Sequence, residues 1–305
     1  MSYKKGIGKK IFVLLCIVTI LILAFIFIKF YKKDGSSKSY YKSGELLYAA
    51  TYKNGEFDGP FKRYYKSGKL LFEATYRDGK ADGVTKAYYE NGQLREEKTY
   101  VYGKENGAIK GYYENGKLQL EGVLKNSKPD GYYKTYYDNG QLKEEGYYED
   151  GNAEGITKSY YKNGQLQEET TYKNGKTNGI AKKYYENGNL QVEAYSKDGK
   201  ADGISKKYYA SGNLEEEMSF ENAVLQGAHK AYYENGQLKE MTTYKDGKFD
   251  GPYTRYYESG HLLFEGALKD GKPEGPYKKY YENGKLQEEG AYKDGKIENR
   301  KGYKL

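Results

Sequence analysis

The residue types that most often carry out catalysis or bind metals are sparse in this chain of 305 residues. The two histidines, His229 and His261, fall at different positions of a repeating pattern, so neither a metal pair nor a Ser-His-Asp arrangement is indicated. We interpret both as surface substitutions. Neighbouring glutamates such as Glu144 and Glu145 would point to opposite faces of a strand, which does not suit a general acid and base. The sequence predicts a protein that is not an enzyme, with no catalytic residue, metal site or cofactor.

Two glycine-containing motifs resemble ligand sites. Stacked Asp-Gly-Lys-x-Asp-Gly turns, as at residues 78–83, place carboxylates near one another, and such turns bind calcium in some β-solenoids. A lysine usually separates the acids here, and Asn or Glu often replaces one of them, so we do not expect calcium binding. Glycine–lysine pairs such as Gly103-Lys104 lack the spacing of a phosphate-binding loop.

Tyrosine is the residue type that best suits a function, because the chain has 40 tyrosines and no tryptophan. Tyrosine offers a large contact area at low entropic cost and is enriched at recognition surfaces. Eleven Tyr-Tyr pairs recur every 24 residues, and the first tyrosine of each pair would lie on one sheet face. The alternative is that these rings only pack on neighbouring Lys and Glu stems. The candidate interaction stripe consists of Tyr64, Tyr88, Tyr112, Tyr136, Tyr160, Tyr184, Tyr208, Tyr232, Tyr256 and Tyr280.

The element that would position these tyrosines is a β-hairpin in every repeat. Each pair is followed by Asn-Gly or Ser-Gly and then by a leucine. Asn-Gly between two strands favours a two-residue type I′ turn. With Asn-Gly at 91–92 as the loop, Tyr89 would lie opposite Leu94, and Lys86 opposite Glu97. Alternation then predicts Tyr89, Leu94 and Tyr100 on one face, as core, and Tyr88 with the Lys–Glu pair on the other.

A second turn in each repeat, such as 78–83, returns the chain to the next hairpin. Ser127 and Ala223 replace the glycine of this turn, and we expect those two loops to adopt a different turn. Eleven hairpins predict about 22 strands. The fold class is therefore all-β, with a single elongated, twisted antiparallel sheet formed as a β-hairpin meander and preceded by one transmembrane helix.

The N-terminal region has a different composition. The run 11–28 is apolar, and at ~1.5 Å per residue it spans ~27 Å, close to the thickness of a bilayer core. We predict a basic cytoplasmic N-terminus at 1–10, a transmembrane helix at 11–30, a linker at 31–39 and eleven repeats at 40–305. The alternative is a cleaved signal peptide, but the run is longer than usual and no small-x-small cleavage site follows it. Lysines flank the run on both sides, and their slight excess before it places the repeats outside the cytoplasm.

The net charge of +8 does not indicate a nucleic-acid partner. Residues 1–38 hold eight lysines and one acid, which leaves 43 basic and 42 acidic residues in the rest of the chain. Nucleic-acid-binding proteins usually carry a basic face, whereas each repeat here mixes Lys with Glu. We expect a solvated mixed-charge surface and no nucleic acid.

The repeat columns Tyr-Tyr-x-Asn-Gly-x-Leu-x-x-Glu, followed by Tyr-Lys-Asp-Gly-Lys-x-Asp-Gly, resemble the bacterial variant form of the MORN repeat over residues 40–305. The resemblance implies β-hairpin repeats with roles in protein interaction, self-association or attachment to membranes and phospholipids, and some variant-repeat proteins carry a toxin–antitoxin antitoxin label. The doubled tyrosine and the lack of tryptophan depart from the best-known pattern.

The sequence as a whole predicts a single-pass membrane protein of the bacterial envelope, held by residues 11–30, whose repeats serve as a scaffold for an unknown protein partner. Two alternatives stay open. One is an antitoxin-like protein that neutralises a toxin, and the other is a module that binds phospholipid or cell-wall glycan.

Overall fold

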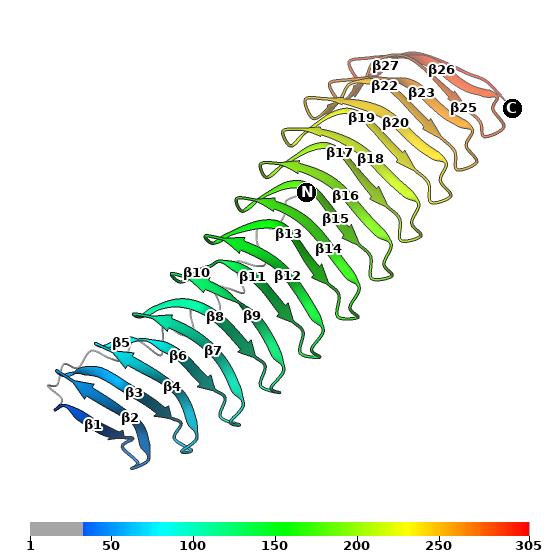
Figure 1. Ribbon diagram of the computed structural model, residues 1–305. Coiled ribbons are helices and arrows are strands. Elements are labelled where there is room, and N and C mark those ends of the chain that lie inside the picture. Colours follow the sequence, from blue (N-terminus) through cyan, green and yellow to red (C-terminus); the bar gives the residue numbers. More distant parts are fainter. Residues whose placement is uncertain (1–32, 305) are drawn as a thin grey trace.

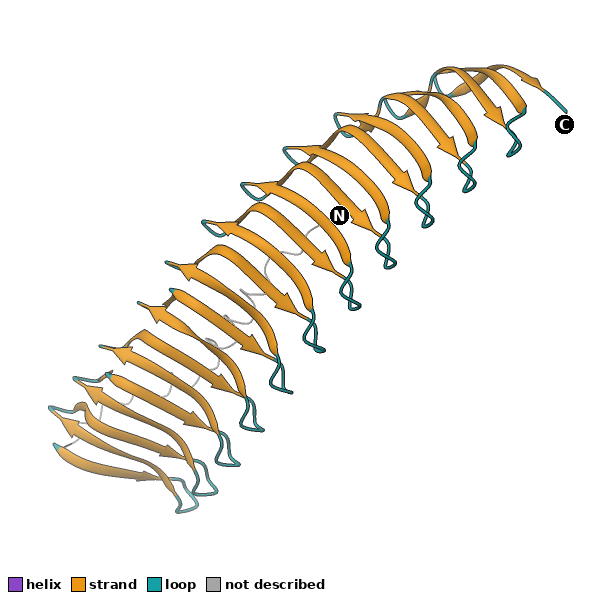
Figure 2. Ribbon diagram, turned by 45° about the vertical axis from the view of Figure 1, so that its right-hand side comes forward, coloured by secondary structure: helices purple, strands orange, loops and turns teal. Residues whose placement is uncertain are grey.

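The repeat region forms one long, open β-sheet. A computed structural model describes residues 33–304. The strands lie across the long axis of the molecule, and the sheet curves and twists slowly from one end to the other (Figures 1 and 2). The described part is all-β and contains no helix long and apolar enough to cross a membrane. The predicted transmembrane helix at 11–30 lies outside the described residues.

Twenty-seven strands make up the sheet. They are β1 (Gly35–Tyr40), β2 (Leu46–Lys53), β3 (Glu56–Tyr64), β4 (Leu70–Arg77), β5 (Lys80–Ala81), β6 (Gly83–Tyr88), β7 (Leu94–Val101), β8 (Lys104–Tyr112), β9 (Leu118–Lys125), β10 (Lys128–Pro129), β11 (Gly131–Tyr136), β12 (Leu142–Glu149), β13 (Asn152–Tyr160), β14 (Leu166–Lys173), β15 (Lys176–Tyr184), β16 (Leu190–Lys197), β17 (Lys200–Tyr208), β18 (Leu214–Glu221), β19 (Val224–Tyr232), β20 (Leu238–Lys245), β21 (Lys248–Phe249), β22 (Gly251–Tyr256), β23 (Leu262–Lys269), β24 (Lys272–Pro273), β25 (Gly275–Tyr280), β26 (Leu286–Lys293) and β27 (Lys296–Gly302).

The topology is a meander, as the sequence predicts. Each strand pairs antiparallel with the strands that precede and follow it in the chain, for example β12 with β11 and β13. The short strands β5, β10, β21 and β24 are each separated from the next strand by a bulge and pair with the same neighbour as that strand. When each short strand is counted together with the strand after it, the 27 strands occupy 23 positions in the sheet. The predicted number of about 22 strands is close to this arrangement.

The Asn-Gly turn differs from the prediction. Repeats are numbered by hairpin, with β1 and β2 as repeat 1. In repeat 3 the Tyr89 amide donates to the Gln93 carbonyl (2.8 Å) and the Gly92 amide to the Tyr89 carbonyl (2.9 Å), so three residues form the loop. Gly92 has a φ of 92°, whereas Asn91 is not among the residues with positive φ. This is the type I turn with a glycine bulge, not the type I′ turn, and both accept Asn-Gly. Lys86 nevertheless pairs with Glu97, because a register shift after Ala87 compensates for the longer loop.

The second turn of each repeat is the one that has type I′ geometry. Asp78 and Gly79 have φ values of 46° and 73°, and Arg77 pairs with Lys80. The expectation that Ser127 and Ala223 change this turn is wrong, because their φ values of 63° and 70° keep the same conformation. The hydrogen bonds along the meander therefore hold these non-glycine residues in a backbone region that costs energy.

The two faces of the sheet have different side chains. The ladder face carries the first tyrosines and the Lys–Glu pairs, and the core face carries the most deeply buried side chains, including Tyr76, Ile109 and Leu120. The predicted grouping of Tyr89, Leu94 and Tyr100 on one face is wrong for the leucine. Leu94 lies opposite Tyr88, and directly opposite residues share a face. The leucine column therefore packs beside the first tyrosine on the ladder face.

Candidate functional site: the ladder face of the sheet

The second tyrosine of each pair joins one repeat to the next. Its hydroxyl donates to a backbone carbonyl in all eleven repeats, at 2.7–3.1 Å; the last of these bonds runs from Tyr281 to Tyr303, after the final repeat. In ten repeats the acceptor is the carbonyl of the next first tyrosine, as in Tyr161 to Tyr184. A hydrogen bond of this kind stabilises the fold by about 1 kcal/mol. The second tyrosine is thus a structural clasp between repeats.

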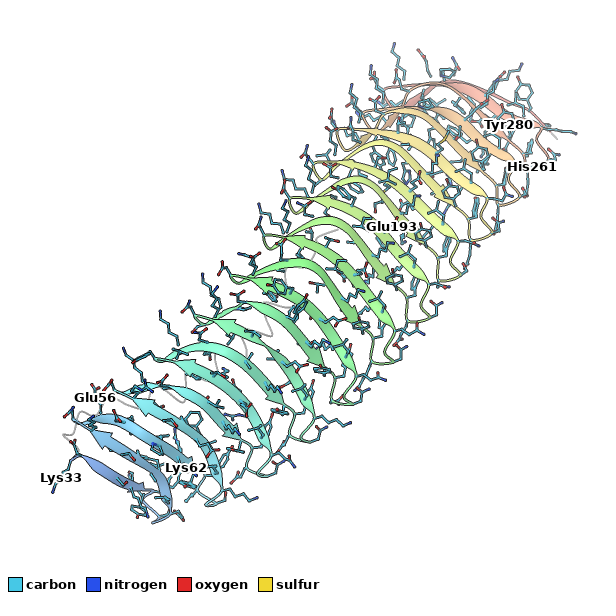
Figure 3. The ribbon with its side chains drawn as sticks, in the orientation of Figure 1. Lys33, Glu56, Lys62, Glu193, His261 and Tyr280 are labelled. Carbon is cyan, nitrogen blue, oxygen red and sulfur yellow. The ribbon has the colours of Figure 1, made fainter. Side chains whose placement is uncertain are left out.

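The hairpin tips are also linked from repeat to repeat. The Asn91 amide donates to the Glu114 carbonyl at 2.9 Å, and its oxygen accepts from the Gln93 amide at 2.9 Å. Where serine replaces this asparagine at Ser259, the His261 ring nitrogen contacts the Glu282 carbonyl at 2.5 Å instead. His261 lies at the edge of the sheet (Figure 3) and is exposed, as the sequence predicts.

The first tyrosines, the predicted interaction stripe, lie along the ladder face and are mostly half-buried. Four of their hydroxyls donate to a glutamate of the preceding repeat at 2.6–2.8 Å. Burial and this hydrogen bond to Glu73 together raise the pKa of Tyr88 to about 12. For Tyr280, labelled in Figure 3, the hydrogen bond to Glu265 is the larger cause, and the pKa is again raised to about 12. These tyrosines therefore fasten neighbouring repeats as well as contributing ring surface.

The Lys–Glu pairs form a second row beside the tyrosines. Lys86 pairs with Glu97 at 3.3 Å, and equivalent pairs recur along the sheet, including Lys182 with Glu193 at 3.3 Å. Figure 3 labels Lys62 and Glu193 of this row. Each pair is a third to a half exposed and stabilises the fold by no more than ~1 kcal/mol because solvent screens it. The row is locally neutral, with positive and negative side chains alternating from strand to strand.

A third row on the ladder face is apolar and exposed. Ile180 and Tyr195 lie directly opposite each other on paired strands, and the equivalent cross-strand pairs follow one another along the sheet in repeats 3–8. Of the twelve large apolar side chains exposed in residues 33–304, seven belong to this row. We call it the apolar row, and its exposed members are Val84, Val123, Tyr132, Ile156, Ile180, Tyr195 and Ile204, with exposures of 42–76%.

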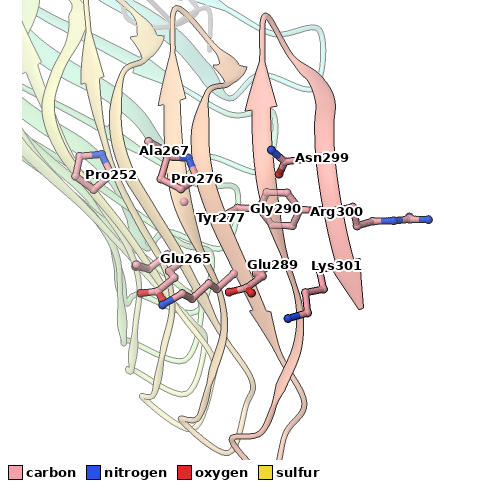
Figure 4. A pocket seen from close by; sticks show the side chains of 13 residues that line it. Pro252, Glu265, Ala267, Pro276, Tyr277, Glu289, Gly290, Asn299, Arg300 and Lys301 are labelled. Atoms are coloured by element: carbon pink, nitrogen blue, oxygen red, sulfur yellow. The ribbon is translucent and has the colours of Figure 1, made fainter. Parts of the chain in front are cut away.

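The apolar row ends where its positions are taken by small residues or proline. In repeats 10 and 11 the equivalent positions hold Pro252, Ala267 and Pro276, and an open hollow of about 830 Å³ lies over them (Figure 4). Glu265 and Glu289 line the same hollow. Both carboxylates accept a tyrosine hydroxyl, from Tyr280 and Tyr303 respectively, so they take part in the linkage between repeats.

On the core face, two buried polar groups were the best chemical candidates. His229 is buried, which contradicts its interpretation as a surface substitution. Its Nε2 lies 2.9 Å from Glu216, and its ring packs edge-on against Tyr244 at 5.7 Å. The hydrogen bond from His229 is the main cause that lowers the pKa of Glu216. Sequence reasoning missed this burial because it compared repeat columns without assigning His229 to a face.

Lys98 is the other buried polar group, with a side chain that is 3% exposed. It pairs with Glu96, and with Glu105 at 2.9 Å. Burial alone would lower the pKa of Lys98, but the two carboxylates outweigh it and the pKa is raised. A lysine held protonated in this way is unsuited to act as a nucleophile or base. Residues 33–304 contain no group of three His, Cys, Asp or Glu side chains placed to hold a metal ion.

The apolar row was not predicted. Its signal is present in the sequence, because Ile156, Ile180 and Ile204 recur at the 24-residue spacing. The prediction followed the invariant tyrosine column instead. The apolar row is carried by positions that vary between repeats, and their exposure follows only from the face and the register.

Two solved protein structures to which this chain is similar show only a weak likeness. A crystal structure of TcdB2-TccC3 is 14% identical, with 88% of this chain covered, 18% of that chain covered and a TM-score of 0.21. The Tc holotoxin pore of Photorhabdus luminescens is 12% identical, with coverages of 82% and 15% and a TM-score of 0.20. The chain thus spans less than a fifth of these proteins, and TM-scores this low support no argument. No curated protein matches.

Comparison with protein families gives a clear result. The model of the MORN repeat variant family matches eleven successive segments, in agreement with the predicted repeats. They cover residues 33–54, 57–78, 81–102, 105–126, 129–150, 153–174, 177–198, 201–222, 225–246, 249–270 and 273–301. With eleven tandem hairpins in one sheet and a match over most of its length, this chain belongs to the MORN repeat variant family.

Proposed function

We propose that this protein is a membrane-anchored, non-enzymatic scaffold of the bacterial envelope that binds another protein through the ladder face. The observation that carries the proposal is the apolar row. Soluble proteins rarely leave large contiguous apolar patches uncovered, and such patches mark interaction sites. Here the exposed side chains are aligned rather than scattered, which favours binding of a structured protein surface.

The neighbouring rows support the same proposal. The Lys–Glu row offers hydrogen-bonding groups of both signs, and the tyrosine row offers rigid aromatic surface beside it. An apolar centre with a polar margin is the usual anatomy of a protein interface. Tyrosines whose hydroxyls are already bonded to Glu73 or Glu265 present mainly their rings to a partner. The predicted tyrosine stripe then acts as the margin of the site and the apolar row as its centre.

The anchor and the location of the repeats rest on the sequence. The apolar run at 11–28 is long enough to span a bilayer, and the slight excess of lysines before it favours a position of the repeats outside the cytoplasm. A sheet held at its N-terminal end would then extend away from the membrane. One long open sheet built from many equivalent hairpins suits a spacer or scaffold.

The test is affinity capture from an envelope extract with the full chain as bait, in three versions. The first is unchanged, the second carries Ile156→Ser with Ile180→Ser, and the third carries Val101→Ser with Val224→Ser. Val101 and Val224 are each 45% exposed but lie outside the apolar row, so they control for lost apolar surface. We expect a protein that binds the first and third baits and is lost from the second.

Two results would overturn the proposal. One is equal capture by all three baits, and the other is pelleting with phospholipid vesicles or peptidoglycan in place of capture of any protein. The location is tested separately with protease added to spheroplasts. Cleavage of the repeats supports their position outside the cytoplasm, and full protection contradicts it.

A further inference from the structure

We propose that the ladder face of repeats 3–8 is the docking surface for a second copy of this chain, which packs face to face in a two-fold dimer. The inference uses the same surface as the proposed function and names its occupant. It begins from the extent of the apolar row. Large exposed members run from Val84 to Ile204, whereas the equivalent positions on either side hold Pro60, Ala228 and Pro252.

The apolar row is self-complementary about its own midpoint. A two-fold axis that lies in the interface, parallel to the strands and midway between β12 and β13, lays the apolar row of one copy against that of the other in the opposite direction. Six strands on one side of the axis, β6 to β12 with the short β10 set aside, then face the six strands β13 to β18 of the second copy.

In this register four of the six facing pairs join a bulky side chain to a smaller one, and the other two join two bulky side chains. The difference in size is largest in two of these pairs, in which Tyr195 meets Ala108 and Tyr132 meets Thr171. Such alternation of large and small residues lets two facing sheets interdigitate. The six facing pairs are Tyr147 with Ile156, Tyr132 with Thr171, Val123 with Ile180, Ala108 with Tyr195, Thr99 with Ile204 and Val84 with Ser219.

The charged row obeys the same symmetry. Because lysine and glutamate alternate from strand to strand, an axis between two strands places every lysine opposite a glutamate, whereas an axis on a strand would oppose like charges. The facing pairs include Glu145 with Lys158, and Glu97 with Lys206. The charged row therefore excludes an axis on a strand and is compatible with the register that the apolar row selects.

The contact area is sufficient for a stable dimer. Twelve strands ~4.8 Å apart give a length of about 55 Å, and two side-chain rows ~7 Å wide give about 800 Å² per copy. This equals the ~800 Å² that each partner buries in an interface of standard size. A patch that is used by both copies in the same way closes on itself, so the product is a dimer and not a fibre.

The first experiment measures mass. We expect the full chain in a mild detergent, at about 10 μM, to scatter light as twice the 34.9 kDa chain. Ile156→Glu with Ile180→Glu should give a monomer of unchanged circular dichroism, and Val101→Glu with Val224→Glu should stay dimeric. A monomeric unchanged chain, or a dimeric Ile156→Glu/Ile180→Glu variant, overturns the dimer.

The second experiment tests the register. In a Cys16→Ser background, the double variant Thr99→Cys/Ile204→Cys brings thiols face to face across the axis, and a bis-maleimide with a short spacer should join two copies. The same sites lie nine strands apart within one chain when β10 is again set aside, so they cannot be joined internally. Thr99→Cys/Pro252→Cys is the mismatched control and should remain unlinked, because Pro252 of the second copy would lie four strands, or ~19 Å, away from Thr99 along the sheet. Equal linking of both variants contradicts the register.

Failure of the dimer can be told apart from failure of the proposed function. A monomeric chain that still captures another protein through Ile156 and Ile180 refutes only the dimer. A monomeric chain that captures nothing refutes both.

Discussion

The clasp formed by the second tyrosine of each repeat leads to a sharp prediction. In Tyr161→Phe the hydroxyl that lies 2.7 Å from the Tyr184 carbonyl is removed, while the ring remains. A net hydrogen bond of this type contributes about 1 kcal/mol, and the carbonyl loses its side-chain partner as well. In a repeat array each repeat contacts only its neighbours, so the loss should act on the junction between repeats 6 and 7.

Amide hydrogen exchange measures this local loss. A change of about 1 kcal/mol corresponds to roughly fivefold faster exchange, because 1.4 kcal/mol is a factor of ten. We expect that acceleration in peptides from β14 and β15, with β4 and β26 unchanged. Tyr132→Phe is the matched control, since Tyr132 is 76% exposed. Unchanged exchange in Tyr161→Phe, or an equal effect of Tyr132→Phe, would refute the clasp.

Three further predictions concern single residues. Ala223→Gly should stabilise the fold by about 0.5–1 kcal/mol in urea unfolding. The left-handed conformation at φ 70° costs alanine ~1–2 kcal/mol, and the larger entropy that glycine loses on folding offsets ~0.5–1 kcal/mol of this gain; destabilisation would contradict the prediction. Burial and the bond to Glu121 raise the pKa of Tyr136 to about 12, so its contribution is fully present below pH ~10 and is lost as pH rises through about 12. Absorbance at 295 nm should show one tyrosinate fewer titrating near pH 12 in Tyr136→Phe, and a lost step near pH 10 would count against the bond. His229→Leu should raise the pKa of Glu216, measured by carboxyl NMR, and destabilise the fold by about 2 kcal/mol, measured by urea unfolding. An unchanged pKa of Glu216 would show that the contact is not made.

The fold was predictable because the repeat imposes the same local rules eleven times. The period, the hairpins and the Lys86–Glu97 pairing all follow from residue spacing. The turn type did not follow, because Gly92 serves equally well in a two-residue type I′ loop and in a three-residue loop with a bulge. The pairing was still correct since the extra loop residue is compensated by the bulge beside Ala87.

The candidate site was harder to predict than the fold. Tyrosine repetition directed attention to Tyr88 and its equivalents, but the structure shows that several of their hydroxyls are bonded to glutamates of the preceding repeat. The exposed surface of Ile156 and Ile180 depends on which face a varying position occupies and on what covers it. Neither is available from one sequence until the register is known.

The most direct test of the central claim is photo-crosslinking in living cells of the source organism. A photoreactive amino acid is placed in the full chain at Ile180, within the apolar row, or at Val224, which is similarly exposed outside it. We predict protein adducts from Ile180, including one of twice the chain mass, and none from Val224. Equal adducts from both positions, or none from Ile180, would contradict the claim that the ladder face is where this protein binds its partners.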